Sequence, residues 1–275
     1  KGIACFVSAV LVVVVSEWLD LMILRLWGFP AVNMENRIFM ALGALETGKR
    51  SATTLINDPL FFMFGGRRFG SPENEKGGIM DMNRAIVESS NVYFYSLANE
   101  MGVDNIHDFM KPLGFGQTTG IDINGEVRGI LPSQAWKRGY FKKQEQQKWF
   151  AGETISLGIG QGYNSFTMLQ LAQATAIIAN NGVKHKPRLV IGTQDPVTRV
   201  MHALPMAPAQ DLGYKPENVA IIRKALQGVT QGGTATRVFA GAGYTSGGKT
   251  GTAQAVSMAA KGKYNSAKME EHQRD

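Results

Sequence analysis

The chain has 275 residues, and 44% of them are hydrophobic, so it can fill the core of one large or two small globular domains. Its net charge is +7, but the basic residues lie in short scattered groups without interleaved aromatics, which argues against nucleic-acid binding. The single cysteine, Cys5, excludes an internal disulfide framework, and the spacing of the four histidines gives no metal site. We expect neither a metal nor a cofactor.

The chain opens with an apolar stretch, residues 3–15, interrupted by Ser8 and followed by Glu17 and Asp20. It is shorter than the roughly 20 residues that span a bilayer. Such a stretch is typical of a signal region or of the end of an anchor, and it favours an exported protein.

Apolar residues at helical spacing predict a short buried helix over residues 38–47, which ends at Gly48. Asp81 is a good N-cap for a second helix, and a third is expected over residues 92–101. The tripeptide Ser89-Ser90-Asn91 between them consists of poor helix formers. It predicts a kinked junction that presents polar groups; the alternative is that it only caps the following helix.

Further helices are expected from Asp104 to Leu113, along residues 168–178 and from Pro216 to about Val229. Residues 57–78 are punctuated by turn residues and predict a loop-rich region. The basic stretch 137–148 predicts an exposed loop or helix face.

Strands are expected near residues 188–200 and 249–256. Between the helices, Gly158, Gly160 and Gly162 alternate with other residues, which suits a backbone that passes close to a ligand or to another segment. As a dinucleotide-binding signal they are incomplete.

The glycine-rich stretch 246–254 sets Lys249, Thr250 and Thr252 close together, which is the chemistry of an anion site. Two interpretations compete. With Gly243 and Gly248, the stretch fits the phosphate-binding pattern G-x-x-x-x-G-K-[ST]. From Lys249 onward it reads Lys-Thr-Gly-Thr, which is typical of serine acyltransferases that react with penicillin.

A phosphate loop requires a buried apolar strand before it, and residues 238–242 make a poor strand. Nucleotide binding is therefore the second hypothesis. A glycine-rich hairpin with a surface lysine is the simplest alternative.

Three groups occur in order: Ser89-Ser90-Asn91-Val92-Tyr93-Phe94-Tyr95, the Gly158–Gly162 section, and Gly-Gly-Lys-Thr-Gly-Thr-Ala-Gln at 247–254. From about Phe39 the chain resembles the transpeptidase domain of the class B penicillin-binding proteins, and among them the members that serve cell-wall elongation. The resemblance implies a mixed α+β fold of the penicillin-recognising, β-lactamase-like type. In that fold an antiparallel sheet is flanked by helices, and the site lies between the sheet and an all-helical lobe. Residues 1–37 are unmatched, and residues 38–275 are expected to form a partial transpeptidase domain, incomplete at both ends.

The resemblance also implies roles for individual residues. Ser89 would pass a proton to the leaving amine, Asn91 would hold the substrate amide, and Lys249 would set the local positive potential. Substrate contacts would come from Ser90, Thr250, Gly251 and Thr252.

One departure from the family concerns the nucleophile. The family's Pro-Gly-Ser-x-x-Lys box is absent, with Met34 at the position of the serine and Arg37 at that of the lysine. A thioether and a guanidinium cannot supply an oxygen nucleophile and its base. The chain's one Ser-x-x-Lys, Ser246 to Lys249, is split by two glycines and is a poor helix start. We therefore expect this chain to be inactive as a transpeptidase.

The partners implied by the resemblance are peptidoglycan stem peptides ending in D-Ala-D-Ala, β-lactams and the membrane-embedded elongation machinery, but no nucleic acid. The location implied is the periplasmic face of the bacterial inner membrane. The alternatives are a module that binds wall peptides or β-lactams without catalysis and, further off, a phosphate-loop protein. Noncovalent retention of a β-lactam would favour the binding module. Thermal stabilisation by a nucleotide would favour the phosphate-loop protein.

Overall fold

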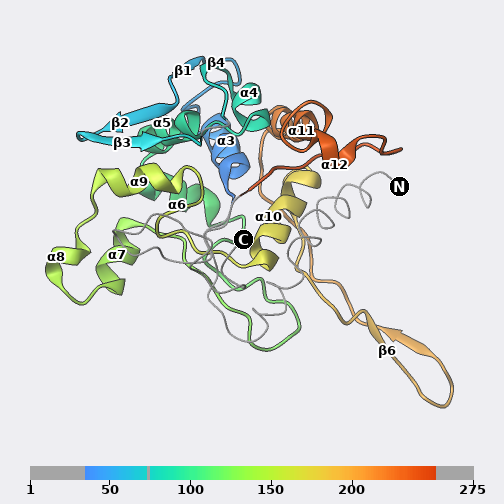
Figure 1. Ribbon diagram of the computed structural model, residues 1–275. Helices are drawn as coiled ribbons and strands as arrows, with labels where there is room; N and C mark the ends of the chain where they lie inside the picture. Colours follow the sequence, from blue (N-terminus) through green and yellow to red (C-terminus); the bar gives the residue numbers. More distant parts are fainter. Residues whose placement is uncertain (1–34, 73–74, 252–275) are drawn as a thin grey trace, which may run out of the picture.

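The computed structural model describes residues 35–72 and 75–251 of the chain. These residues form a mixed structure in which helices pack around a central one and short antiparallel hairpins lie at the edges (Figure 1). The helices are α3 (Arg37–Glu46), α4 (Met82–Val87), α5 (Asn91–Met101), α6 (Val103–Met110), α7 (Gln134–Tyr140), α8 (Gln144–Gln147), α9 (Ala151–Leu157), α10 (Met168–Ala179), α11 (Pro216–Gln231) and α12 (Thr236–Phe239). The expected fold class, mixed α and β, is confirmed.

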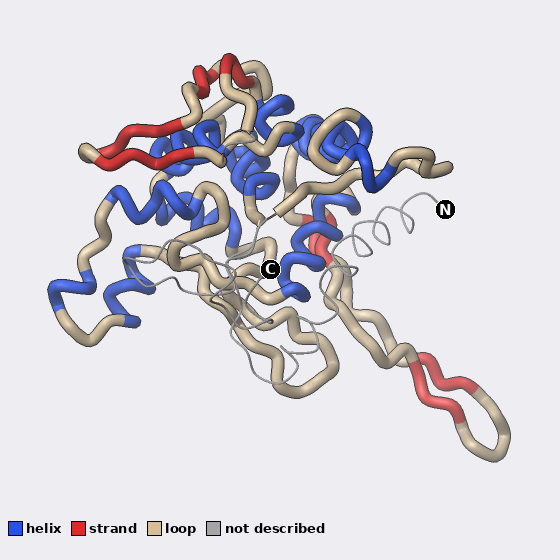
Figure 2. The backbone as a smooth tube through the Cα atoms, in the orientation of Figure 1, coloured by secondary structure: helices blue, strands red, loops and turns tan. Residues whose placement is uncertain are grey.

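The strands come in four antiparallel pairs, coloured red in Figure 2. They are β1 (Ile56–Asp58) with β4 (Gly78–Met80), β2 (Phe61–Phe64) with β3 (Arg67–Gly70), β5 (Val183–Lys184) with β8 (Gln210–Asp211), and β6 (Gly192–Gln194) with β7 (Met201–Ala203). Within the described residues the strands pair only two by two. Residues 57–78, expected to be loop-rich, carry the β2–β3 hairpin, enclosed by the β1–β4 pair, because their aromatic side chains have a helical layer to pack on.

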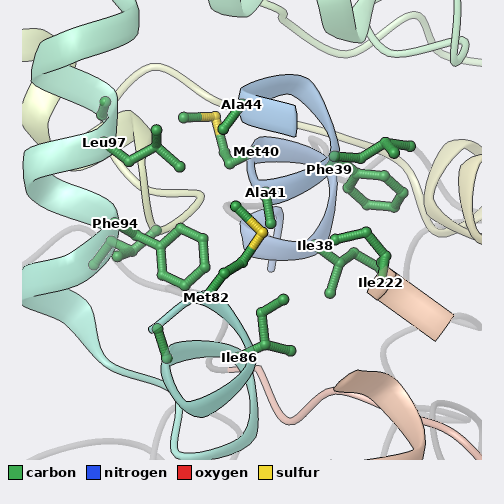
Figure 3. Close-up of a cluster of buried hydrophobic side chains, with 14 of the residues drawn as sticks. Ile38, Phe39, Met40, Ala41, Ala44, Met82, Ile86, Phe94, Leu97 and Ile222 are labelled. Carbon is green, nitrogen blue, oxygen red and sulfur yellow. The ribbon is translucent and has the colours of Figure 1, made fainter. Parts of the chain in front are cut away.

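Helix α3 is the centre of the core, and the expected helix over residues 38–47 is confirmed. Its apolar residues leave no exposed face: Phe39, Ala41 and Leu42 are fully buried. Helices α4, α5, α6 and α11 surround it, as the close-up of its side chains with Met82, Phe94 and Ile222 shows (Figure 3). Because α3 is enclosed on all sides, its first residues are held firmly at the edge of the core.

The junction between α4 and α5 is kinked as expected. Asp81 caps α4 by accepting a hydrogen bond from the backbone N–H of Arg84 at 2.7 Å. Ser89 then takes a positive φ of 65°, which is uncommon for a residue with a side chain. Ser90 caps α5 by accepting from the N–H of Tyr93 at 3.1 Å, so the kink and the cap occur together.

The later helices follow the sequence closely. Thr167 caps α10 in a capping box with Gln170, and Pro216 stands in the first turn of α11. Helix α6 begins one residue before Asp104, with Gly102 as its N-cap, and ends at Met110 before a turn. The strand expected near residues 188–200 is present as β6, in an arm that projects from the body (Figure 1).

The glycine-rich section after α9 does approach another segment. A Cβ on Gly158 would collide with the carbonyl of Phe94 and with Ala98, both on α5. The close approach that the sequence predicted is therefore a helix-to-helix contact. It lets α9 pack on the same helix that begins at the Ser89–Asn91 junction.

The basic stretch 137–148 is only partly exposed, so the expectation of an exposed stretch is wrong for Lys137. This side chain is 3% exposed and lies on α7 among aromatic rings. Its ammonium is paired with Glu153 of α9, which neutralises the charge and allows burial.

In the described part of the chain no helix is both long and apolar enough to cross a membrane. The apolar stretch 3–15, Met34 and Thr252 lie outside the described residues, as does most of the strand expected over 249–256. Residues 249–251, its described part, are not in a strand.

Candidate functional site

Four side chains from three separate parts of the sequence meet at the N-terminus of α3. The Lys249 ammonium donates to the Ser89 hydroxyl at 2.7 Å. Arg37 donates to the same Ser89 oxygen at 2.5 Å through Nη1, and through Nη2 to the side-chain oxygen of Asn91. The structure thus brings together Ser89, Asn91 and Lys249, the three residues singled out as catalytic, with the Arg37 guanidinium between two of them.

Local structure explains how these groups come to face one another. Arg37 is the first residue of α3 and Asn91 the first of α5, so both side chains project from helix starts. The positive φ of Ser89 turns its hydroxyl out of the line of α4. The segment before Lys249 is tied to α11, where Thr230 donates to the carbonyl of Ser246 at 2.9 Å.

Glu35 is a member of this cluster that the sequence did not reveal. One carboxylate oxygen accepts from the backbone N–H of Arg37 and the other from its Nη1, each at 3.0 Å. The second oxygen also lies 3.8 Å from the Lys249 ammonium. An acid just before a helix start was the only available signal, and it is common at ordinary helix N-termini.

Burial dominates the electrostatics at Lys249, whose side chain is 4% exposed. It lowers the lysine pKa from 10.5 to about 8, and the neighbouring Arg37 charge adds to the shift, whereas Glu35 and Glu75 oppose it. Within the described part of the chain, the ammonium donates to two oxygens, those of Ser89 and of the Thr250 carbonyl at 2.9 Å. Its charge is therefore incompletely balanced by the described residues.

Glu75 closes the side of the cluster next to α5. Its carboxylate accepts from the backbone N–H of Asn91 at 3.3 Å. Burial raises the Glu75 pKa, against the lowering effects of that hydrogen bond and of the Arg37 charge. The site thus holds two cations and two carboxylates in a region sheltered from water.

The residues expected to bind substrate are placed differently from one another. The Ser90 hydroxyl is 1% exposed and donates to Asp58 at 2.6 Å, so it serves the fold around β1 and the α5 cap. The Thr250 hydroxyl is exposed and shares a 2.8 Å hydrogen bond with Thr234. Gly251 lies against Glu35, whose Cβ would be 2.7 Å from a Cβ added there. Thr252 is outside the described residues.

The phosphate-loop hypothesis is not supported by its structural context. The residues before Gly243 form the short helix α12 and a turn instead of a buried strand. Ser246 is 6% exposed and lies in coil, so Ser246 and Lys249 do not open a helix as a Ser-x-x-Lys pair would. No group of three or more metal-ligand side chains occurs within residues 35–72 and 75–251.

The cluster can hold an anionic or strongly polar group and can move a proton between Ser89 and Lys249. Both Arg37 and Lys249 donate to the Ser89 oxygen, which stabilises negative charge there. The Arg37 guanidinium stays protonated and so cannot act as a base. At the start of α3, the position of Arg37, the cluster therefore has a permanent cation that donates hydrogen bonds and no base.

The family model for the penicillin-binding protein transpeptidase domain matches residues 37–271. The match covers most of the chain, so this protein belongs to the penicillin-binding protein transpeptidase family. The resemblance seen in the sequence motifs is confirmed.

Two named relatives are peptidoglycan D,D-transpeptidases called MrdA. The one from Acinetobacter baumannii is 38% identical over 237 residues, which cover 86% of this chain and 34% of the relative. The one from Escherichia coli K12 is 33% identical over 244 residues, or 86% of this chain and 37% of the relative. The chain therefore spans about a third of the length of these relatives.

Solved structures of PBP2 are similar as well. Pseudomonas aeruginosa PBP2, solved in complex with WCK 5153, superposes with a TM-score of 0.68 at 35% identity, covering 82% of this chain and 50% of that one. PBP2 from Helicobacter pylori, in a complex with MreC, gives a TM-score of 0.69 at 28% identity, covering 82% and 40%. The arrangement of helices described above is thus that of a PBP2 transpeptidase domain.

Proposed function

We propose that residues 38–275 belong to a transpeptidase domain of the PBP2 type, whose reaction is the cross-linking of peptidoglycan stem peptides during wall elongation. The observation that carries this proposal is the meeting of Lys249, Ser89 and Asn91 at the N-terminus of α3. Ser89 and Asn91 belong to one sequence motif and Lys249 to another, and the contact between Lys249 and Ser89 joins residues 160 positions apart.

Each residue has a role in the proposed site. Lys249 supplies positive potential, and Thr250 with Thr252 binds the terminal carboxylate of a stem peptide. In a member of the family that has the nucleophile, the serine at the Ser89 position would pass a proton toward the leaving amine, and the 2.7 Å contact with Lys249 suits that transfer. Asn91 holds the substrate amide, and the backbone N–H after Gly251 stabilises the oxyanion.

We further propose that this chain binds such ligands without acylation. Met34 and Arg37 stand where the nucleophilic serine and its lysine belong, and neither side chain can replace them. Arg37 also occupies the hydrogen-bonding positions of both Ser89 and Asn91. The function that this site supports is therefore the binding of wall peptides or β-lactams without catalysis.

The proposal includes a setting for the molecule. Its relatives are named as peptidoglycan transpeptidases, and one similar structure is a complex of PBP2 with MreC. We propose the periplasmic face of the inner membrane as its location and an elongation-machinery protein as its partner. The ligands are D-Ala-D-Ala stem peptides and β-lactams.

The test is intact-mass spectrometry of the full 275-residue chain after incubation with a fluorescent penicillin. We expect no mass increase, and reversible binding in a parallel fluorescence anisotropy titration. The double variant Met34→Ser with Arg37→Lys should also remain unlabelled, because it lacks the Pro-Gly turn before the helix start.

Two results would overturn the proposal. A stoichiometric acyl adduct, mapped by peptide mass spectrometry to Ser89 or Ser246, would show that the chain has a working nucleophile. Absence of any reversible binding of penicillin or stem peptide would remove the binding function itself.

A further inference from the structure

We propose that Glu35 is an internal carboxylate that occupies the cationic part of the site and sets its preference against anionic ligands. This inference rests on the proposed binding function and concerns a residue that lies between the positions of the missing nucleophile and base. In this chain the Glu35 carboxylate of the protein itself takes part of the place that an anionic group of a ligand would fill beside the two cations.

Three positive groups converge on the Glu35 carboxylate. Its first oxygen accepts the Arg37 backbone N–H at the start of α3, where the helix dipole is positive. Its second oxygen lies 3.0 Å from Arg37 Nη1 and 3.8 Å from Lys249 Nζ. The side chain is 11% exposed, so solvent screens these attractions only weakly.

The position of Glu35 also places it where a ligand would lie. A Cβ added to Gly251 would be 2.7 Å from the Glu35 Cβ, so Glu35 packs directly on the Lys249–Gly251 segment. A ligand carboxylate drawn to Lys249 would meet a fixed negative charge at close range. That repulsion lowers affinity for anions and leaves neutral ligands little affected.

Glu35→Gln is the informative variant, because the amide keeps the size and the oxygen that caps α3 while it removes the charge. The probe is fluorescently labelled acyl-D-Ala-D-Ala, measured by anisotropy with its free C-terminal carboxylate and again with a C-terminal amide. We expect the variant to bind the carboxylate probe about tenfold more tightly than the unmodified chain, and the amide probe with less than a twofold change.

The matched control is Glu145→Gln, an equal charge change on an exposed side chain of α8. It should alter neither affinity by more than about twofold, since exposed charges are screened. Circular dichroism and a thermal melt establish that each variant is folded, and Glu35→Ala provides a second way to remove the charge.

The outcomes separate this inference from the proposed function. If the unmodified chain binds the carboxylate probe and neither Glu35 variant binds it more tightly, the role of Glu35 is overturned while the binding function stands. Equal gains for the carboxylate and amide probes would also overturn it, because the effect would be steric. If the unmodified chain and both variants bind neither probe, both proposals fail.

Discussion

Two buried lysines of this protein differ in how closely their ammonium groups are paired with opposite charge. Lys137 and Lys249 have side chains that are 3% and 4% exposed, so both ammonium groups are removed from water. Lys137 is paired with the Glu153 carboxylate at 2.5 and 2.6 Å and donates to the carbonyl of Lys148 at 2.8 Å. Its ammonium also lies within 6.0 Å of four aromatic rings, those of Phe141, Trp149, Phe150 and Tyr163.

Among residues 35–72 and 75–251, Lys249 is paired less closely with opposite charge. The carboxylate of Glu35 lies 3.8 Å from its ammonium and is already bonded to Arg37, which is itself a cation. A closely paired buried charge holds elements together, and we propose that the more loosely paired charge of Lys249 serves to attract a ligand.

The largest expected effect is at the balanced lysine. Lys137→Met leaves the Glu153 carboxylate, 24% exposed, without its cationic partner, and should destabilise the fold by about 3 to 4 kcal/mol. Urea denaturation followed by tryptophan fluorescence measures this directly, since Trp136 and Trp149 lie beside the pair. Lys143→Met, on an exposed side chain, is the control and should cost less than about 0.5 kcal/mol. Equal effects of the two changes would show that the ion pair does not hold α7 to α9.

The second prediction concerns pH and the unbalanced lysine. Burial lowers the Lys249 pKa from 10.5 to about 8, so between these values the unfolded chain carries a proton that the folded chain has lost. Stability contributed by this group therefore rises with pH across that window and is constant below it, where both states carry the proton. Between pH 7 and pH 10.5, the free energy of unfolding of the unmodified chain should rise by about 2 to 3 kcal/mol relative to that of Lys249→Met. Parallel pH profiles of the two proteins would contradict the account.

Ser89 and Ser90 show a smaller difference of the same kind, between a residue of the site and a residue that stabilises the fold. Ser90→Ala removes the α5 cap and the partner of buried Asp58, and should cost about 2 kcal/mol in denaturant unfolding. Ser89→Gly relieves the positive φ and should leave stability within about 1 kcal/mol, while weakening ligand binding. The reverse order of stabilities would show that Ser89, not Ser90, is the structural residue.

The sequence predicted the helices well because their signals are local. Asp81 and Pro216 mark helix starts, and the Ser89–Asn91 tripeptide marks the kink through the weak helix propensity of its own residues. The residues of the site were found for a different reason, since their motifs resemble those of a known family.

The parts that the sequence did not reveal depend on contacts between distant residues. Lys137 stands in a basic stretch that looks solvated, and its partner Glu153 is separated from it by 16 positions and an intervening helix. Glu35 acquires its role only because Lys249 approaches from the far end of the chain. Neither pairing leaves a periodic or local pattern that could be recognised in advance.

We infer that the buried charge of Lys249, which the described residues pair only loosely, is what binds a ligand. Anisotropy titration of a fluorescent penicillin tests it most directly, with the unmodified chain, Lys249→Met and, as control, Lys142→Met on an exposed side chain. We predict reversible binding that weakens at least about tenfold in Lys249→Met and stays unchanged in Lys142→Met. Equal affinity of Lys249→Met and the unmodified chain would contradict the claim.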